Sequence, residues 1–189
     1  SFIYLFNKKS PSSKKWLKNK SQNYYWFSRS AYSLWIINRW WKNFTDNSIS
    51  NIWIPNYFCD EPLSLLRSDK PNFYFYPIND NLTPDWEKCY EEASKSKISI
   101  FILVHYFGSP SDGELARKFC NKHECILVED GAHVLIPYKG VGSFGEFTFY
   151  SPHIPKLSFV FFIHVTFQML VLMKEDHLPF VVASFAAGI

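Results

Sequence analysis

The chain has 189 residues, enough for one domain with a substantial hydrophobic core. Its 20 Lys and Arg against 17 Asp and Glu give a net charge of +3, so charge alone identifies no class of partner. Six lysines precede position 21 without an acidic residue, and we interpret residues 1–26 as a basic N-terminal segment. The four cysteines form no CxxC pair, which predicts reduced thiols in a cytoplasmic protein and no metal site.

From residue 31 to residue 150, helix-like and strand-like segments alternate along the chain. The expected helices span residues 31–42, 61–67, 83–93 and 111–123, and the expected strands span 51–55, 72–76, 98–104, 125–128 and 147–150. The strand segments are rich in branched and aromatic residues and some are nearly continuously apolar, which is typical of strands covered on both faces. The alternation predicts an α/β domain built around a mostly parallel sheet.

Two of the expected helices carry start signals. Thr83 is the expected N-cap of one helix, with Pro84 at its first position and acidic residues in its first turn. Ser111 and Glu114 have the spacing of a capping box before an apolar run. These signals predict helices that begin close to residues 83 and 111.

Polar and ionisable residues follow four of the expected strands. They lie in residues 55–59, 105–108, 129–133 and 151–156. Ligands of open α/β sheets bind beyond the carboxyl ends of the strands, so the sequence predicts a candidate site at this edge.

These strand ends carry a resemblance to a known family. The run Val128-Glu129-Asp130-Gly131-Ala132-His133, then residues 142–146, then Ser151 and Lys156, resembles the core of the DegT/DnrJ/EryC1/StrS aminotransferases. Residues 28–31, 54–59 and 104–108 resemble further segments of the family in the same order. The resemblance spans about residues 27–156. It implies part of a fold-type-I large domain that binds pyridoxal 5'-phosphate, with a mostly parallel α/β sheet and the C-terminal small domain missing.

The resemblance implies a role for each of five residues. Asp130 would keep the ring nitrogen of pyridoxal 5'-phosphate protonated, because opposite charges in contact favour both ionised forms. Lys156 would be the catalytic lysine that binds the cofactor covalently and moves protons on the substrate. Ser30 and Ser151 would bind the phosphate, and His133 would lie near the cofactor. Asp130 as a turn residue, Lys156 as a surface lysine and Ser30 as a simple N-cap remain open alternatives. For His133 the open alternative is an ordinary packed or exposed side chain.

Other residues near the strand ends have structural interpretations. Glu129 points to the opposite face from Asp130 in an extended chain, so we expect a structural role for it. His105 is expected to line the pocket without a chemical role. Tyr57 or Phe58 is a candidate to stack on the cofactor ring.

The sequence changes character after Lys156. Residues 157–173 are apolar without a clear period, and the Pro-Asp-Ala-Gly turn that the family carries there is absent. The codons for residues 167–172 permit that turn in a neighbouring reading frame. We therefore predict that residues 157–189 are an apolar tail produced by a frameshift, and that the chain is truncated.

The implied function is transfer of an amino group, from a donor such as glutamate, to a nucleotide-linked keto sugar for surface polysaccharide synthesis. The complete enzyme is expected to be a cytoplasmic homodimer without a nucleic-acid partner or a membrane span, and the truncated chain is expected to be inactive. One alternative is a dehydratase of the same family, in which His153 would replace the lysine. Another is a non-catalytic α/β module with a membrane-associating tail.

Overall fold

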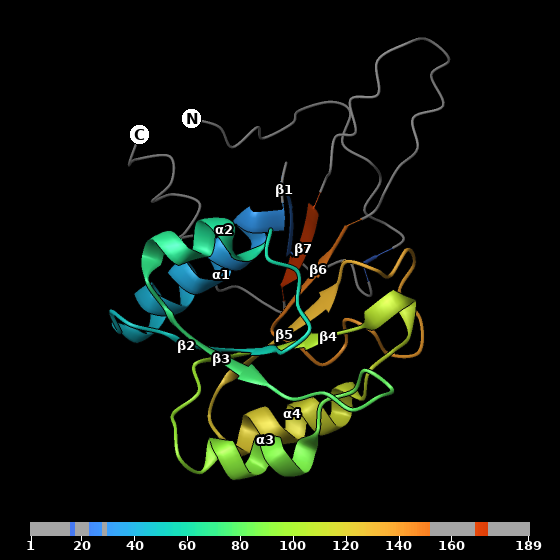
Figure 1. Ribbon diagram of the computed structural model, residues 1–189. Coiled ribbons are helices and arrows are strands. Elements are labelled where there is room, and N and C mark those ends of the chain that lie inside the picture. Colours follow the sequence, from blue (N-terminus) through green and yellow to red (C-terminus); the bar gives the residue numbers. More distant parts are fainter. Residues whose placement is uncertain (1–15, 18–22, 28–29, 152–168, 174–189) are drawn as a thin grey trace, which may run out of the picture.

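The computed structural model describes residues 16–17, 23–27, 30–151 and 169–173 (Figure 1). Their strands form one seven-stranded sheet in the order β1-β7-β6-β5-β4-β2-β3. The strands are β1 (Asn23–Phe27), β2 (Asn51–Pro55), β3 (Asn72–Tyr76), β4 (Ile100–Val104), β5 (Ile126–Gly131), β6 (Phe147–Tyr150) and β7 (Met169–Met173). Strands β2 to β6 are parallel to one another, and β7 is antiparallel to both β6 and β1. The predicted α/β class with a mostly parallel sheet is confirmed.

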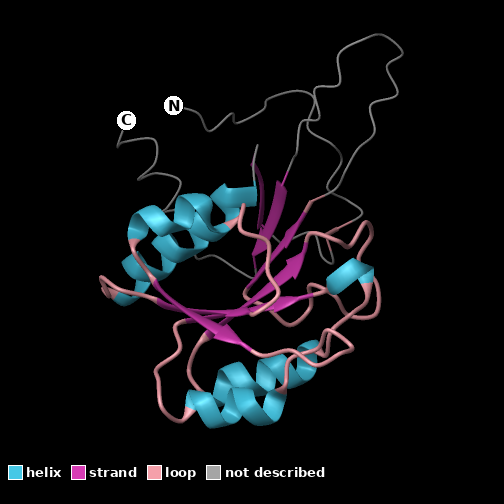
Figure 2. Ribbon diagram, in the orientation of Figure 1, coloured by secondary structure: helices cyan, strands magenta, loops and turns pink. Residues whose placement is uncertain are grey.

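Helices cover both faces of the sheet (Figure 2). On one face lie α1 (Ser30–Thr45) and α2 (Leu63–Leu66), and on the other lie α3 (Trp86–Ala93) and α4 (Gly113–Lys122). Two short 3-10 helices, η2 (Arg67–Asp69) and η3 (Tyr106–Gly108), follow α2 and β4. This three-layer arrangement explains why the strand sequences are apolar on both sides.

Strand β4 shows how one segment serves two cores. All five of its residues are buried. Ile100 and Ile102 pack into the core beneath α1 and α2, whereas Phe101 and Leu103 pack into the core beneath α3 and α4. Because successive side chains of a strand point to opposite faces, a run without a polar residue fills both layers.

The predicted strands agree closely with the structure. Strands β2, β3 and β6 have the predicted bounds, and β4 begins two residues later than predicted. Strand β5 continues to Gly131, three residues beyond its predicted end, because the chain stays paired with β4 and β6 there. Glu129 and Asp130 therefore lie within the strand rather than after it.

Both predicted helix starts are wrong in detail. Helix α3 is capped by Asp85, whose carboxylate accepts from the N–H of Lys88, while the Thr83 hydroxyl is bonded to Asn81. Helix α4 is likewise capped by Asp112 rather than by Ser111. Ser111 has another partner, since its hydroxyl donates to the carbonyl of Val104 at the end of β4.

The predicted domain boundaries divide this sheet. Strand β1 crosses the boundary at residue 26, and β7 lies within the predicted apolar tail. The rest of that tail, Lys156 and His153 fall outside the described residues, and so do most of residues 1–26. None of the described helices combines the length and the hydropathy that a membrane span requires.

Candidate active site

Asp130 lies near the carboxyl end of β5, at the edge of the sheet where ligands of such folds bind. Its side chain shares a face of the sheet with Val128, which belongs to the core beneath α1 and α2. Asp130 is only 7% exposed, so its carboxylate is almost fully withdrawn from water. A carboxylate in this position is costly to keep ionised without a positively charged partner.

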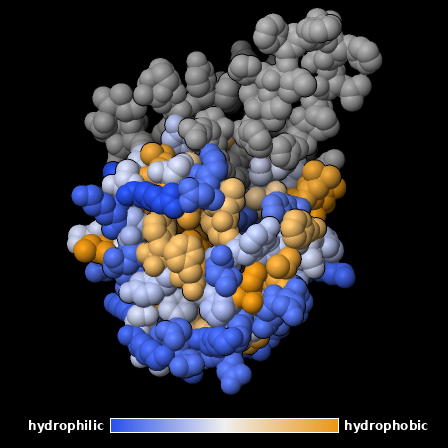
Figure 3. Space-filling model, in the orientation of Figure 1, coloured by the Kyte–Doolittle hydropathy of each residue, from blue (hydrophilic) through white to orange (hydrophobic). Residues whose placement is uncertain are grey.

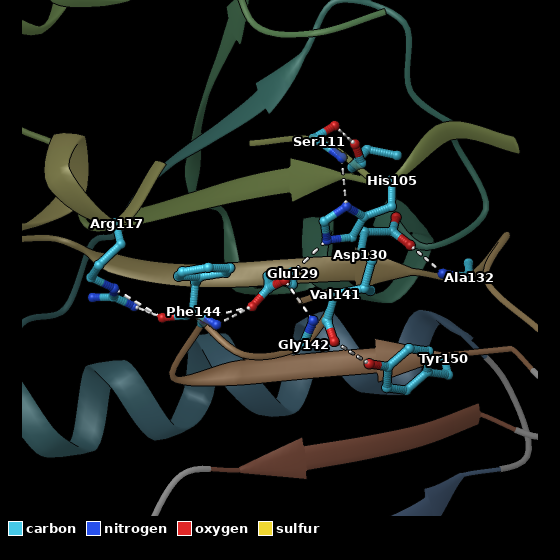
Figure 4. Close-up of polar contacts among 12 residues, drawn as sticks. His105, Ser111, Arg117, Glu129, Asp130, Ala132, Val141, Gly142, Phe144 and Tyr150 are labelled. Carbon is cyan, nitrogen blue, oxygen red and sulfur yellow. Dashed lines mark hydrogen bonds and ion pairs between the residues drawn. The ribbon is translucent and has the colours of Figure 1, made fainter. Parts of the chain in front are cut away.

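Among the described residues, a single hydrogen bond is donated to the carboxylate of Asp130. Its Oδ1 accepts from the N–H of Ala132 at 2.8 Å (Figure 4), the one hydrogen bond to this carboxylate among the described residues. Burial raises the pKa of Asp130 to about 6, although the Ala132 N–H, His133 and His105 act in the opposite direction. The site therefore contains a buried carboxylate with a raised pKa, whose Oδ2 accepts no hydrogen bond from the described residues.

Glu129 points to the other face and is fully buried. Its Oε2 accepts from the N–H of Gly142 at 2.7 Å, and its Oε1 accepts from the N–H groups of Phe144 and Gly145 at 2.7 and 2.6 Å. Burial by itself would raise the pKa of Glu129, but His105 and the N–H groups of Gly145 and Gly142 outweigh it and hold the pKa below its ordinary value. The predicted structural role of Glu129 agrees with this arrangement: its carboxylate fixes the loop before β6.

His105 connects the ends of β4 and β5. Its ring Nε2 lies 3.0 Å from Oε2 of Glu129, and its Nδ1 accepts from the N–H of Ser111 at 3.0 Å. Because Nδ1 is an acceptor, the ring proton lies on Nε2 and is donated to the carboxylate. His105 is 1% exposed, so it belongs to the buried support of the site rather than to its lining.

His133 lies at the surface close to Asp130. Its Nδ1 accepts from the N–H of Phe107 at 3.2 Å, and the two rings stack with centroids 5.5 Å apart. Phe107 has a φ of 51°, in the left-handed region that side chains rarely adopt. The structure thus brings His133 to the same sheet edge as Asp130, with its ring held by the turn after β4.

The other candidate residues are placed only in part. Ser30 is the first residue of α1, as the resemblance implies, and Ser151 directly follows β6 and is half-buried. Lys156 lies outside the described residues. The structure therefore brings Asp130 and His133 together and does not test the positions of the remaining side chains.

Apolar side chains are exposed around this edge of the sheet. On the face drawn in Figure 3, hydrophobic residues reach the surface in several patches between hydrophilic ones. Among the residues that follow β2, β4 and β5, five large ones are exposed: Tyr57, Phe107, Leu135, Ile136 and Tyr138. Tyr57 is tied to the edge through its carbonyl, which accepts from the hydroxyl of Tyr106. This exposed group of five residues is called the strand-end surface below.

The sequence did not reveal the polar support beneath Asp130. The contact of Glu129 with residues 142–145 spans 13 to 16 positions, and that of His105 with Glu129 spans 24. Two signals were present: an ionisable residue inside an apolar strand, and a glycine-rich loop before the next strand. A buried carboxylate needs donors, and a glycine-rich loop supplies backbone N–H groups.

These features define an α/β fold with a buried carboxylate at the carboxyl edge of a parallel sheet. Residues 78–158 match the model of the DegT/DnrJ/EryC1/StrS aminotransferase family. The matched segment contains Asp130, His133 and Ser151, and the resemblance predicted from the sequence is confirmed for this part of the chain.

Several solved structures share this fold. PseC of Helicobacter pylori, an aminotransferase involved in the biosynthesis of pseudoaminic acid, has a TM-score of 0.66 at 19% identity, with 87% of this chain and 43% of PseC covered. NtdA of Bacillus subtilis, with the cofactor PMP bound, has a TM-score of 0.68 at 15% identity, with coverages of 86% and 36%. A GDP-4-keto-6-deoxy-D-mannose-3-dehydratase of E. coli with bound hydrated PLP has a TM-score of 0.66 at 16% identity, with coverages of 87% and 41%.

The chain therefore spans well under half the length of these solved relatives. At such identities the likeness establishes the fold, that of part of a fold-type-I large domain. No curated protein matches the sequence. In the part of the chain that the structure describes, no cluster of His, Cys, Asp or Glu has the arrangement of a metal site.

Proposed function

We propose that this chain forms the cofactor-binding part of a pyridoxal-phosphate-dependent aminotransferase that acts on nucleotide-linked keto sugars. The observation that supports it best is Asp130, a buried carboxylate near the carboxyl end of β5 whose pKa is raised to about 6. The protonated ring nitrogen of pyridoxal 5'-phosphate is a cation of suitable size and direction for such a carboxylate. The residues present thus fit the cofactor.

The cofactor, when bound, supplies an electron sink for the amino-group transfer. Asp130 holds a proton at the ring nitrogen, and His133 lies beside it at the surface. Ser30, at the start of α1, and Ser151 are the proposed phosphate ligands, because hydroxyls and the free N–H groups of a helix start bind anions. Lys156 is the proposed lysine of attachment and the group that moves the substrate proton.

The substrate proposal comes from the solved relatives. They include the dehydratase ColD with bound GDP-perosamine and DesI in the presence of its TDP-sugar product. By analogy we propose a nucleotide-linked sugar as substrate, a donor such as glutamate, and a role in surface polysaccharide synthesis. All four cysteines are free, which supports a reducing, cytoplasmic environment. Since the chain covers at most 43% of these relatives, we propose cofactor binding without turnover for the 189 residues alone.

Reduction with borohydride tests the proposed lysine. The full chain, incubated with pyridoxal 5'-phosphate and then reduced, is expected to carry one phosphopyridoxyl group on Lys156 in peptide mass spectrometry. Lys156→Ala should abolish that adduct, whereas Lys139→Ala, which removes an exposed lysine of the same domain, should not. An intact cofactor complex without a lysine adduct would instead favour the dehydratase alternative. Labelling spread evenly over surface lysines would contradict the proposal.

We also propose that the strand-end surface packs against a second copy of the chain. Phe107, Leu135 and Ile136 are 72%, 64% and 51% exposed, and exposed apolar groups of this size commonly mark an interface. Ile136→Glu is expected to shift sedimentation velocity from dimer towards monomer. The matched control is Ile49→Glu. Ile49 is 59% exposed, and it precedes β2, whereas the strand-end surface lies beyond the carboxyl end of that strand. A wild-type chain that sediments as a monomer at all concentrations would rule this interface out.

A further inference from the structure

Four hydrogen-bond donors converge on the carboxylate of Glu129. Three are the backbone N–H groups of Gly142, Phe144 and Gly145, at 2.6 to 2.7 Å, and the fourth is Nε2 of His105 at 3.0 Å. Hydrogen bonds to an ionised acceptor are among the stronger ones in proteins, and a fully buried carboxylate requires them. The conformation of the 142–145 loop and the ionised state of Glu129 therefore depend on each other.

His105 extends this network to the main chain of Asp130. Its backbone N–H donates to the carbonyl of Asp130 at 3.0 Å, while its ring donates to the side chain of Glu129. The same ring accepts from the N–H of Ser111 and so holds the loop that leads into α4 (Figure 4). One buried histidine thus contacts both residues of the Glu129–Asp130 pair.

Glycines allow the close approach that this network needs. A Cβ at Gly145 would lie 2.6 Å from the carbonyl oxygen of Phe147 and 3.2 Å from Cγ of Glu129. Gly142 has a φ of 75°, and a Cβ there would lie 2.2 Å from the hydroxyl of Tyr150. Only glycine fits at these two positions, and each then presents its N–H to the carboxylate.

We infer that the His105–Glu129 pair is a positioning unit for Asp130, an inference that rests on the proposed function. Glu129 and Asp130 are successive residues of one strand with side chains on opposite faces. Rotation of the strand at Glu129 would therefore swing the Asp130 carboxylate away from its ligand. The four donors prevent that rotation on one face, and the backbone bond from His105 fixes the carbonyl of Asp130. A reacting group displaced by even ~1 Å loses much of its effect.

The key variant is Glu129→Gln, because glutamine has almost the same shape but no charge. Its single amide oxygen cannot accept from all four donors, and its NH₂ group would face a donor. The matched control is Glu146→Gln. Glu146 lies in the same region, but its carboxylate accepts from Arg117 and from the N–H of Leu127. Leu127 lies three residues before Asp130 in β5. His105→Asn, which removes only one donor, is the milder second variant.

Three measurements on the full chain distinguish positioning from simple stabilisation. The first is the dissociation constant of pyridoxal 5'-phosphate, measured by tryptophan fluorescence. The second is the pH at which the bound cofactor is half-protonated, measured by its absorbance and called the pH midpoint. The third is amide exchange of Gly142, Phe144 and Gly145 in the cofactor-free chain. We expect Glu129→Gln and His105→Asn to weaken binding about tenfold, the equivalent of one unsatisfied buried donor. Both should lower the pH midpoint and speed the exchange, and Glu146→Gln should leave binding and midpoint unchanged.

A lowered midpoint in both variants supports the inference, because a loss of stability alone does not change the proton affinity of a ligand that is still bound. Wild-type binding with the same midpoint in Glu129→Gln, His105→Asn and Glu146→Gln would overturn the inference and leave the proposed function intact. Failure of the wild-type chain to bind the cofactor would overturn both. If Glu129→Gln does not fold, His105→Asn decides between these outcomes.

Discussion

Asp130→Asn is expected to weaken the binding of pyridoxal 5'-phosphate about 100-fold or more. Removing one member of a buried ion pair leaves the other charge without compensation, which typically costs about 3 to 5 kcal/mol. Asparagine keeps the shape of the side chain and its bond to the N–H of Ala132, so the loss isolates the charge. The dissociation constant, measured by fluorescence titration at pH 7.5, tests this expectation.

The same substitution is expected to stabilise the cofactor-free chain. Burial raises the pKa of Asp130 from 3.8 to about 6 in the folded state. A group with a raised folded pKa favours folding below its unfolded pKa, and this contribution is lost as the pH rises through the folded value. The wild type should therefore lose up to about 3 kcal/mol relative to Asp130→Asn between pH 4 and pH 6. Urea unfolding at a series of pH values measures this difference.

The control for both effects is Asp80→Asn, since Asp80 is an exposed carboxylate of the same domain. It should change neither cofactor binding nor the pH dependence of unfolding. Tighter or unchanged binding by Asp130→Asn would contradict the proposed role of Asp130. A pH-independent stability difference would show instead that the pKa of Asp130 is the same in the folded and the unfolded chain. Opposite changes in binding and stability are typical of a functional group that the fold tolerates at a cost.

The strands were predictable from the sequence because their signal is local. Three apolar runs with polar residues before or after them span residues 51–55, 72–76 and 147–150. The strands observed there begin and end at these same residues, so the local sequence was enough to predict their bounds. The helix starts were not predictable to the residue. Thr83 and Ser111 are good cap residues by type, but their hydroxyls donate to Asn81 and Val104, and an aspartate nearby caps each helix instead.

The candidate site also has a part that was predictable from the sequence and a part that was not. Asp130 and His133 follow from a short run of sequence and its resemblance to a family. The contacts of Glu129 and His105 depend on which loops the fold brings beneath β5, and no local pattern specifies that. The resemblance assigned the cofactor contact to Asp130, and strand alternation predicted only that Glu129 points to the opposite face, where its carboxylate accepts from the N–H of Gly142.

Phe119→Ala is expected to lower the free energy of unfolding by about 3 to 5 kcal/mol, the usual range for removing a buried ring. Phe119 of α4 is fully buried, and its ring lies 5.0 to 5.1 Å from those of Tyr90 and Phe101 and 5.5 Å from that of Trp86. It therefore joins both helices of one face to the middle of the sheet. Urea unfolding followed by tryptophan fluorescence measures the loss, which is large beside the ordinary stability of a domain.

Phe75→Ala is the matched control, because Phe75 lies on edge strand β3 and is 60% exposed. It should cost far less than Phe119→Ala, since little apolar area leaves water at that position. A large difference between the two variants in the free energy of unfolding is expected only if the 189-residue chain forms this core by itself and unfolds cooperatively. Equal effects of the two substitutions, or a wild type without a cooperative transition, would show that this core needs additional chain to fold. The cofactor experiments on Asp130 and Glu129 would then have to be carried out in that larger protein.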